Sequence, residues 1–232
     1  MSSMKTLQVA RAAFSLGVLT LGATLGACGD NKVGPNVAAS VAASSGDNQT
    51  ILAGNHASAP LVAVVRNSSG SALPNVEVRW SVGNGGGSIQ TVVDTTNANG
   101  EASTIYYSPA PSGTTKVNAT AGGASHQFTM TIVADTVVGM LLAYGGDNAA
   151  ALVGNPLTLT AKAIDRFGNV IKGVDVAWSA SSGQLKATTG TTDSTGKTSN
   201  VITVGPDTGK ISIVATSKFN AVTFTVNSIA TP

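Results

Sequence analysis

The chain of 232 residues has one cysteine, few charged residues and few aromatic residues. A single cysteine excludes any disulfide within the molecule. Two of the 13 basic residues, Lys5 and Arg11, precede that cysteine, so the rest of the chain has 11 basic and 11 acidic residues. This balance excludes the basic surface that nucleic-acid binding requires. Aromatic residues make up only 4% of the chain, which leaves few candidates for a sugar-binding platform.

Catalytic motifs are absent as well. The two histidines, His56 in a predicted loop and His126 near the start of a predicted strand, are 70 residues apart and share no motif. Nucleophilic catalysis needs a hydroxyl or thiol beside a base that a third group orients. The sequence contains no HExxH, GxSxG or Cys-x-x-Cys pattern. We therefore expect a protein with no enzyme activity, no cofactor and no metal-binding residues.

The amino-terminal end has the three parts of an export signal: a cationic start, an apolar stretch over residues 12–24 and small residues before the cysteine. The apolar stretch is shorter than the roughly 20 residues of a transmembrane helix. Leu25-Gly26-Ala27-Cys28 is typical of bacterial lipoprotein processing. The pattern predicts that residues 1–27 are a signal peptide that is removed, and that Cys28 is the site of lipid attachment. An ordinary secretory signal with an incidental cysteine is the alternative.

The residues after the cysteine predict where an acylated protein would reside. Gly29 follows Cys28, so the Asp that retains enterobacterial lipoproteins in the inner membrane is absent from that position. We expect a lipid-anchored protein of the cell envelope, in the outer membrane or at the cell surface rather than the inner membrane. Residues 28–36 are rich in turn formers and have little to bury, which predicts a lipidated amino terminus and linker.

The remaining chain contains an internal repeat. Residues 73–81 (LPNVEVRWS) and 171–179 (IKGVDVAWS) share Val, Val, Trp and Ser at an offset of 98 residues. Further matches follow at offsets of 96 and 100, as small loop insertions would produce. The repeat predicts two modules, over residues 37–134 and 135–232.

Within each module, apolar residues alternate with polar ones, as in a strand with one buried face. Val76, Val78 and Trp80 show this period, and residues 157–163 and 211–215 repeat it. Turn-forming clusters of Gly and Asn separate about six to eight such segments per module, which predicts an all-β fold of two tandem immunoglobulin-like β-sandwiches. We expect Trp80 and Trp178 on the third strand of each module, packed in the core against aliphatic side chains in place of a disulfide.

Several of these segments resemble a known family. Leu73-Pro74-Asn75-Val76-x-Val78-x-Trp80 and residues 95–102 (TTNANGEA) are similar to the bacterial immunoglobulin-like domains (group 1) of the intimin and invasin type. Residues 165–170 (DRFGNV) and 192–197 (TDSTGK) extend the resemblance to the second module. The resemblance covers most of residues 37–232 and implies a stalk or adhesive module at a bacterial surface. The outer-membrane barrel and the cysteine-containing lectin-like domain of those proteins are not recognisable, so their receptor-binding role is not carried over.

Carboxylates recur near the predicted turns, at Asp147, Asp165 and Asp193. Ca²⁺ requires six to eight converging oxygens, whereas Asp also favours turns because its side chain bonds the adjacent backbone. We therefore predict structural roles for these residues and assign no metal site. A weak calcium site between the modules, around Asp135 and Asp147, is the alternative.

Two functional classes remain open. The preferred one is a non-catalytic, lipid-anchored surface or envelope protein whose tandem modules act as a spacer or as adhesion and interaction modules. Its partners would be the membrane, through the lipid, and a protein or glycan ligand at loops of the distal module, such as Asp165–Lys172 or Gly205–Lys210.

The alternative class is a carbohydrate-binding accessory lipoprotein that recognises cell-wall or extracellular polysaccharide. Tyr106, Tyr107 and Tyr144 are the only candidates for its aromatic platform, and adjacent Tyr106 and Tyr107 are expected to face opposite sides of a strand. A third, weaker option is assembly with a partner by strand addition at an open sheet edge.

Overall fold

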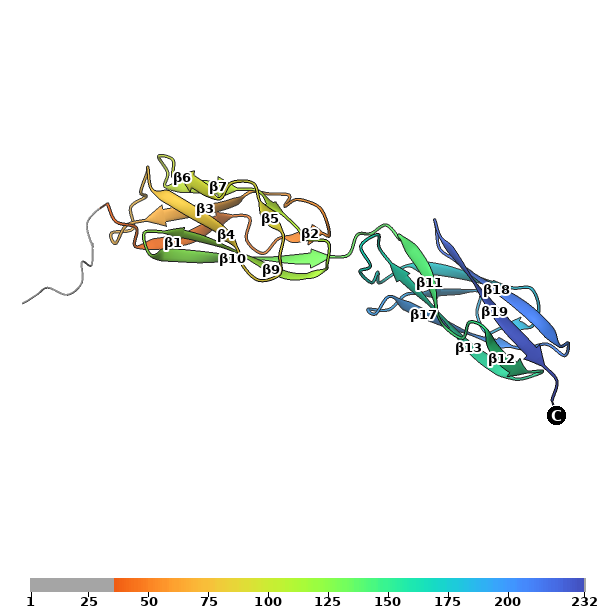
Figure 1. Cartoon of the computed structure of the whole chain (residues 1–232). Helices are drawn as coiled ribbons and strands as arrows, with labels where there is room; N and C mark the ends of the chain where they lie inside the picture. Colours follow the sequence, from red (N-terminus) through yellow and green to blue (C-terminus); the bar gives the residue numbers. More distant parts are fainter. Residues whose placement is uncertain (1–35, 232) are drawn as a thin grey trace, which may run out of the picture. The chain divides into compact units, whose positions relative to one another are not determined.

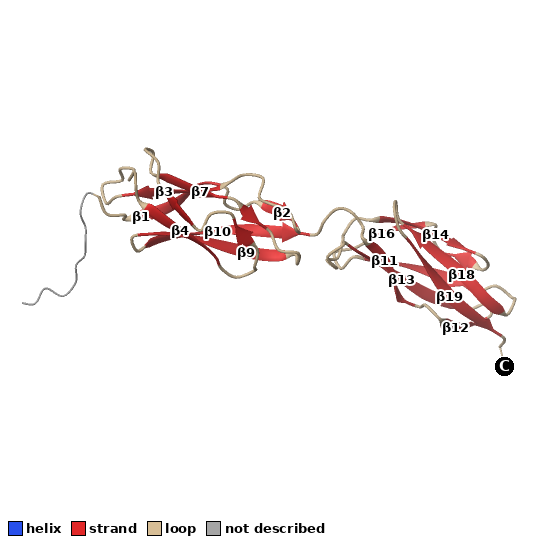
Figure 2. Cartoon of the chain, turned by 45° about the horizontal axis from the view of Figure 1, so that its top comes forward, coloured by secondary structure: helices blue, strands red, loops and turns tan. Residues whose placement is uncertain are grey.

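The computed structural model describes residues 36–231. The predicted signal peptide, the lipid-attachment residue Cys28 and almost all of the predicted linker lie outside the described residues. The described chain consists of strands and loops without a helix (Figure 2). It accordingly has no helix that is long and apolar enough to cross a membrane.

The first sandwich contains ten strands, β1 to β10 (Figure 1). They form one sheet in the order β1-β3-β7, a second in the order β2-β10-β9-β4-β6, and a small pair, β5-β8. Their bounds are β1 Ser40–Ser45, β2 Thr50–Leu52, β3 Leu61–Arg66, β4 Glu77–Val82, β5 Ser88–Ile89, β6 Val93–Thr95, β7 Glu101–Thr104, β8 Tyr106–Tyr107, β9 Gly113–Ala121 and β10 Ala124–Val133.

The second sandwich contains nine strands, β11 to β19, in two sheets of order β11-β13-β17-β15 and β12-β19-β18-β14-β16. The order β11-β13-β17 repeats β1-β3-β7, and the five-stranded sheet repeats β2-β10-β9-β4-β6, so the all-β, tandem immunoglobulin-like fold predicted from the repeat is confirmed. The copies differ at β15, which pairs with β17, whereas β5 pairs with the separate strand β8. The bounds are β11 Met140–Gly145, β12 Ala149–Leu152, β13 Pro156–Ile164, β14 Asp175–Ala180, β15 Gln184–Leu185, β16 Thr189–Thr191, β17 Lys197–Thr203, β18 Gly209–Thr216 and β19 Ala221–Ile229.

The strand count exceeds the predicted six to eight per module because several strands have only two to four residues. The short strand β2 also changes which strand, counted along the chain, carries the tryptophan. The chain leaves the first sheet after β1 and pairs β2 in parallel with β10 of the opposite sheet. Trp80 therefore lies on the fourth strand of its sandwich instead of the third, and Trp178 on β14 is displaced in the same way by β12.

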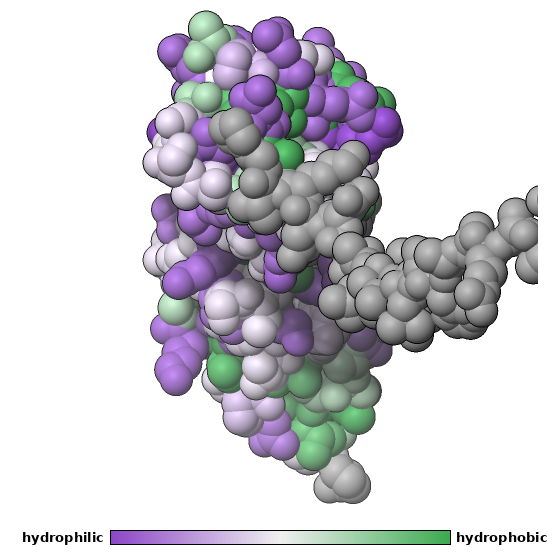
Figure 3. All heavy atoms as spheres, turned by 90° about the vertical axis from the view of Figure 1, so that its left-hand side faces the viewer, coloured by the Kyte–Doolittle hydropathy of each residue, from purple (hydrophilic) through white to green (hydrophobic). Residues whose placement is uncertain are grey.

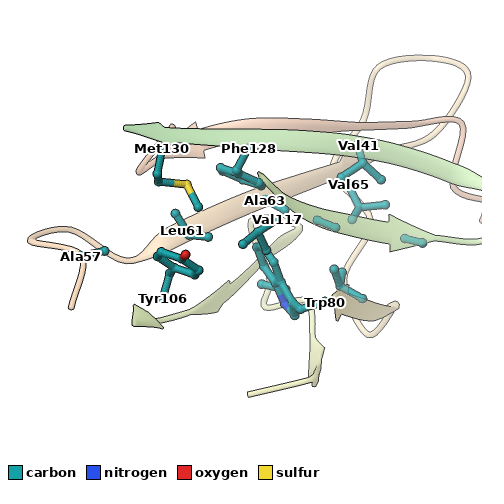
Figure 4. Close-up of a cluster of buried hydrophobic side chains, with 14 of the residues drawn as sticks. Val41, Ala57, Leu61, Ala63, Val65, Trp80, Tyr106, Val117, Phe128 and Met130 are labelled. Atoms are coloured by element: carbon teal, nitrogen blue, oxygen red, sulfur yellow. The ribbon is translucent and has the colours of Figure 1, made fainter. Parts of the chain in front are cut away.

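Each sandwich has its own apolar core. Figure 4 shows the core of the first, where side chains from both sheets point toward one another around Trp80. Trp80 and Trp178 are only 3% and 4% exposed, which confirms their prediction as core residues. Both belong to cores made mainly of aliphatic side chains, and each also has an aromatic neighbour, since the indole centroids lie 5.6 Å from Phe128 and 5.7 Å from Phe224. Such tilted aromatic pairs add about 0.5–1.5 kcal/mol beyond their buried area.

A buried threonine explains the repeated Thr-Thr sequence. The hydroxyl of Thr96 donates to the carbonyl of Leu73 and accepts from the N–H of Val76. In the second sandwich, Thr192 makes the same two bonds to Ile171 and Val174. The hydroxyl fixes the loop that precedes each tryptophan strand, so its position is constrained in both copies.

Polar side chains cover much of the exterior. On the face drawn in Figure 3, hydrophilic and near-neutral residues predominate, and hydrophobic residues gather at separate places. This distribution agrees with apolar side chains that mostly point between the sheets.

We predict that Trp80→Ala and Trp178→Ala each lower the free energy of unfolding of their own sandwich by about 3–5 kcal/mol, because each leaves a cavity between the sheets. The chain has two tryptophans, one per sandwich, so the remaining indole reports on the intact sandwich. In urea, far-ultraviolet dichroism should show an early and a late transition, and tryptophan fluorescence only the late one.

The matched control is Val92→Ala, whose side chain is 61% exposed, and which should change the free energy of unfolding by less than about 0.5 kcal/mol. Coincident transitions by both probes in the tryptophan variants would contradict separate cores.

Candidate binding surfaces

The loop of residues 165–174 joins β13 to β14, and its geometry depends on one buried carboxylate. Asp165 is 2% exposed. Its Oδ1 accepts the N–H groups of Phe167 and Asn169, at 2.8 and 2.9 Å. Its Oδ2 accepts the N–H of Asp135 at 3.0 Å and the Asn169 side-chain amide at 2.9 Å. Burial alone would raise the pKa of this carboxyl, but the hydrogen bonds from Asn169, Asp135 and Phe167 together lower it below its ordinary value.

The bond to Asp135 places this loop beside residues 134–139, the segment that enters the second sandwich. Asp165–Lys172 thus lies at the entry side of the second sandwich, the module predicted to be distal. The chain reverses direction between β11 and β13, which brings the end of β13 back to the entry side. The other predicted loop, Gly205–Lys210, lies at the opposite end, where the carbonyl of Asp207 accepts from the hydroxyl of Ser228.

The other turn carboxylates also bind the backbone. Asp147 Oδ1 accepts the N–H groups of Asn148 and Thr225, at 2.9 and 2.8 Å. Asp193 Oδ1 accepts the N–H groups of Thr195 and Lys197 and the hydroxyl of Thr195. These bonds lower the pKa of Asp193, and the bond from the Thr195 hydroxyl has the largest effect. These contacts match the predicted structural roles.

The calcium alternative would require Asp135 and Asp147 to converge. They precede and follow β11, a six-residue strand that spans about 20 Å, so they do not share a site. Among residues 36–231, no group of three or more acidic, histidine or cysteine side chains is placed to hold a metal ion.

The two histidines lie in different surroundings. His56 Nδ1 is 2.9 Å from the carbonyl of Ala57, and its ring meets Tyr107 edge-on. His126 Nε2 is 3.5 Å from Asp47 Oδ2, and its ring packs edge-on against Phe128. The structure does not bring the histidines together.

The three candidate tyrosines do not form one platform. Tyr106 is fully buried in the first core, where its hydroxyl donates to the carbonyl of Gly86. Tyr107 is 41% exposed on the opposite side of the same strand, as predicted for adjacent residues. Tyr144 lies in the second sandwich and is 55% exposed. Only Tyr107 and Tyr144 are accessible to a ligand.

Tyr144 is accompanied by two lysines. The Lys197 ammonium lies 3.8 Å from the centre of its ring, and the Lys162 ammonium lies 5.5 Å from it. A hydrogen bond and the charge of Lys197, with a smaller effect from Lys162, lower the pKa of the Tyr144 hydroxyl. Burial has the opposite effect on Tyr106 and raises its pKa. Tyr144 was predicted from the sequence as a candidate for ligand contact, but neither lysine was.

A groove of about 450 Å³ opens at the entry side of the second sandwich. It lies between residues 136–138, the loop before β14 and the turn from β18 to β19. Phe219, in that turn, is 68% exposed, and the Lys218 ammonium lies 5.0 Å from its ring centre. The corresponding turn of the first sandwich is Gly122-Gly123, whereas residues 217–220 form the turn of the second. This difference in turn length is the feature of the sequence that could have indicated the groove.

The fold can now be compared with known proteins. Residues 41–133 match the family model of the bacterial Ig-like domain, group 1. The resemblance inferred from the motifs is therefore confirmed for the first bacterial Ig-like sandwich, and the second has the same strand order. Comparison with curated proteins gave no match.

Several solved structures of bacterial surface proteins match the chain at low identity, and FdeC supports the fold. The Escherichia coli adhesin FdeC is 18% identical over 80% of this chain and 63% of its own, with a TM-score of 0.50. The D0-D1 domain of intimin is 18% identical over 82% of this chain and 95% of its own, with a TM-score of 0.33. Invasin, titled a bacterial integrin-binding protein, is 21% identical over 83% of this chain and 40% of its own, with a TM-score of 0.41. The chain thus spans less than two thirds of the FdeC and invasin structures.

We predict that Asp165→Asn lowers the free energy of unfolding by about 1–3 kcal/mol at neutral pH, because the amide that replaces Oδ2 faces two donors. Folding lowers the pKa of Asp165, so its carboxylate stabilises the fold above its ordinary pKa of 3.8 and loses this effect as the pH falls through the lower folded value. Urea midpoints of wild type and variant should therefore converge in acid. A difference that does not shrink as the pH falls below 3.8 would contradict this role.

The matched control is Asp207→Asn, which changes an exposed carboxyl at the opposite end of the second sandwich. It should leave the urea midpoint almost unchanged both at neutral pH and in acid.

We further predict that Lys197→Gln raises the pKa of Tyr144 toward 10.0, because the hydrogen bond and the charge that stabilise the phenolate are weakened. The measurement is the near-ultraviolet absorbance of tyrosinate against pH. Lys210→Gln, on the other sheet, serves as the control and should leave the titration unchanged. Identical titrations of wild type and Lys197→Gln would show that the lysine does not act on Tyr144.

Proposed function

We propose that this protein is a non-catalytic, lipid-anchored protein of the bacterial surface or envelope, in which tandem Ig-like sandwiches serve as spacer and as adhesion or interaction modules. The main support is the duplicated bacterial Ig-like fold, in which each sandwich has a separate apolar core. The carboxylates of Asp147, Asp165 and Asp193 bind backbone N–H groups at turns, and both histidines pack edge-on against aromatic rings.

The proposal includes the processing of the amino terminus. Residues 1–27 are removed, Cys28 carries the lipid, and residues 28–36 form the linker to sandwiches at 37–134 and 135–232. Acyl chains supply the membrane attachment, since one chain alone gives only marginal binding and two or more hold stably. We place the anchored protein in the outer membrane or at the cell surface.

The related structures support the class of function but not a ligand. FdeC is described as an adhesin and invasin as integrin-binding, and these statements apply to those proteins. At their level of identity the likeness concerns the fold, and folds of this kind host many functions. The accessory carbohydrate-binding class stays the second candidate because Tyr144, exposed and flanked by lysines, suits a sugar ligand.

The anchor is tested with labelled palmitate in a bacterial host that expresses the full chain. Wild type should incorporate the label and sediment with membranes, because Cys28 provides the thiol that is acylated. Cys28→Ser should do neither while it keeps the far-ultraviolet dichroism of a β-protein. Wild type that reacts with a maleimide dye and takes up no label would contradict the proposal.

Protease treatment of intact cells then tests the surface role. Degradation of both sandwiches without lysis supports adhesion at the cell surface. Protection until the outer membrane is opened supports a spacer within the envelope and refutes adhesion to external partners.

A further inference from the structure

We propose that the outer face of the β11-β13-β17 sheet in the second sandwich binds a carboxylate-bearing polysaccharide through Tyr144, Lys162 and Lys197. This inference names a ligand class and a site that the proposed function leaves open. It depends neither on the lipid anchor nor on the spacer role.

The three side chains come from three adjacent strands (Figure 1). Lys162 on β13 lies directly opposite Lys197 on β17 in the antiparallel ladder. Tyr144 occupies the bulge of β11, between Ala143 and Gly145, where the register with β13 shifts. The bulge adds one residue to the edge strand and directs the tyrosine to the outer face above the lysines.

Neither lysine on this face has a salt-bridge partner among the described residues. Like charges directly opposite each other across two strands destabilise a sheet. Asp193, whose carboxylate caps its own turn, is the acidic group that Lys197 influences. A bound carboxylate would relieve the repulsion between the ammoniums and form charge-assisted hydrogen bonds with them.

The first sandwich provides an internal comparison at the same positions. Its bulge lies between Ala43 and Ser45, and Val64 pairs with Glu101 as Lys162 pairs with Lys197. Ser44 replaces the tyrosine there, and its hydroxyl donates to Glu101 at 3.1 Å. The same three positions thus hold Ser44, Val64 and Glu101 in the first sandwich. In the second sandwich they hold Tyr144, Lys162 and Lys197. The fold therefore does not require the tyrosine and lysines at these positions.

The surroundings favour a polysaccharide over an acidic peptide. The hydroxyls of Thr160 and Ser199 are 2.8 Å apart and lie two residues from the lysines on the same two strands, where they offer neutral hydrogen bonds. Tyr144 is 55% exposed, which leaves part of its ring for contact with the apolar side of a sugar ring. A peptide added to the β11 edge would meet the bulge, which interrupts strand pairing.

The test measures binding of polygalacturonate to the full chain in detergent, with dextran as the neutral polymer and polyglutamate as the acidic peptide. The combined variant Tyr144→Ser, Lys162→Val and Lys197→Glu places in the second sandwich the residues that the first one holds. It should bind polygalacturonate at least about tenfold more weakly, since two ammonium contacts and one ring contact are lost. Wild-type binding should weaken with added salt.

Controls separate the site from general charge. Lys162→Gln with Lys197→Gln should weaken binding, whereas Lys116→Gln with Lys210→Gln, of equal charge, should leave it unchanged. Thermal unfolding midpoints establish that each variant is folded. Repeating the assay with Cys28→Ser, which lacks the anchor, should give the wild-type affinity, so a failed anchor leaves this result intact.

Three outcomes would overturn the proposal. The first is no binding of polygalacturonate by wild type. The second is equal weakening by both lysine pairs, which would show a general charge effect. The third is polyglutamate binding as tight as polygalacturonate binding and unaffected by Tyr144→Ser, which would identify an acidic-peptide site instead.

Discussion

The structure depends on the packing of one indole against one phenyl ring between two sheets, repeated in each sandwich. The chain has one cysteine, which lies outside the described residues, so no disulfide within the chain can join the sheets. Burial of apolar surface has to supply that link, at roughly 25 cal/mol for each Å² removed from water. The alternation of apolar and polar residues along β4, β9 and β10 delivers the side chains to this contact, and β14, β18 and β19 do so in the second copy.

A core of this kind restricts the inner face of each strand and leaves the outer face open to change. The two copies retain the tryptophan, its phenylalanine partner and the threonine that fixes the preceding loop. On the outer face they differ, with Ser44 and Glu101 in one copy and Tyr144 and Lys197 in the other. Duplication therefore provides one stable framework with two different surfaces, and the function we propose resides in those surfaces.

The period of the apolar residues was sufficient to predict the fold, because a strand with one buried face leaves a strict pattern in the sequence. The repeat then predicted two copies, and the described residues form two sandwiches of matching topology. The short strands β2 and β12 were missed since three or four residues give too brief a pattern. The sequence placed Asp165–Lys172 in the second module but could not assign it to one end of the sandwich, because the end follows from strand direction, which composition does not reveal.

The binding surfaces were only partly predictable for a related reason. Tyr144, Lys162 and Lys197 lie on three strands and are brought together by sheet register and a bulge. Their counterparts Ser44, Val64 and Glu101 occur at offsets of 100, 98 and 96. The difference in charge and aromaticity between the copies was therefore apparent only once the copies were aligned strand by strand. The signal peptide and Cys28 stay predictions, since they lie outside the described residues.

Native-state hydrogen exchange tests the central claim most directly, because it measures the free energy of opening at each amide. The account predicts that the slowest-exchanging amides are those of β4, β9 and β10 and of β14, β18 and β19, around the two ring pairs. Strongest protection in the β11-β13-β17 sheet, or in the strands β1, β3 and β7, would contradict it.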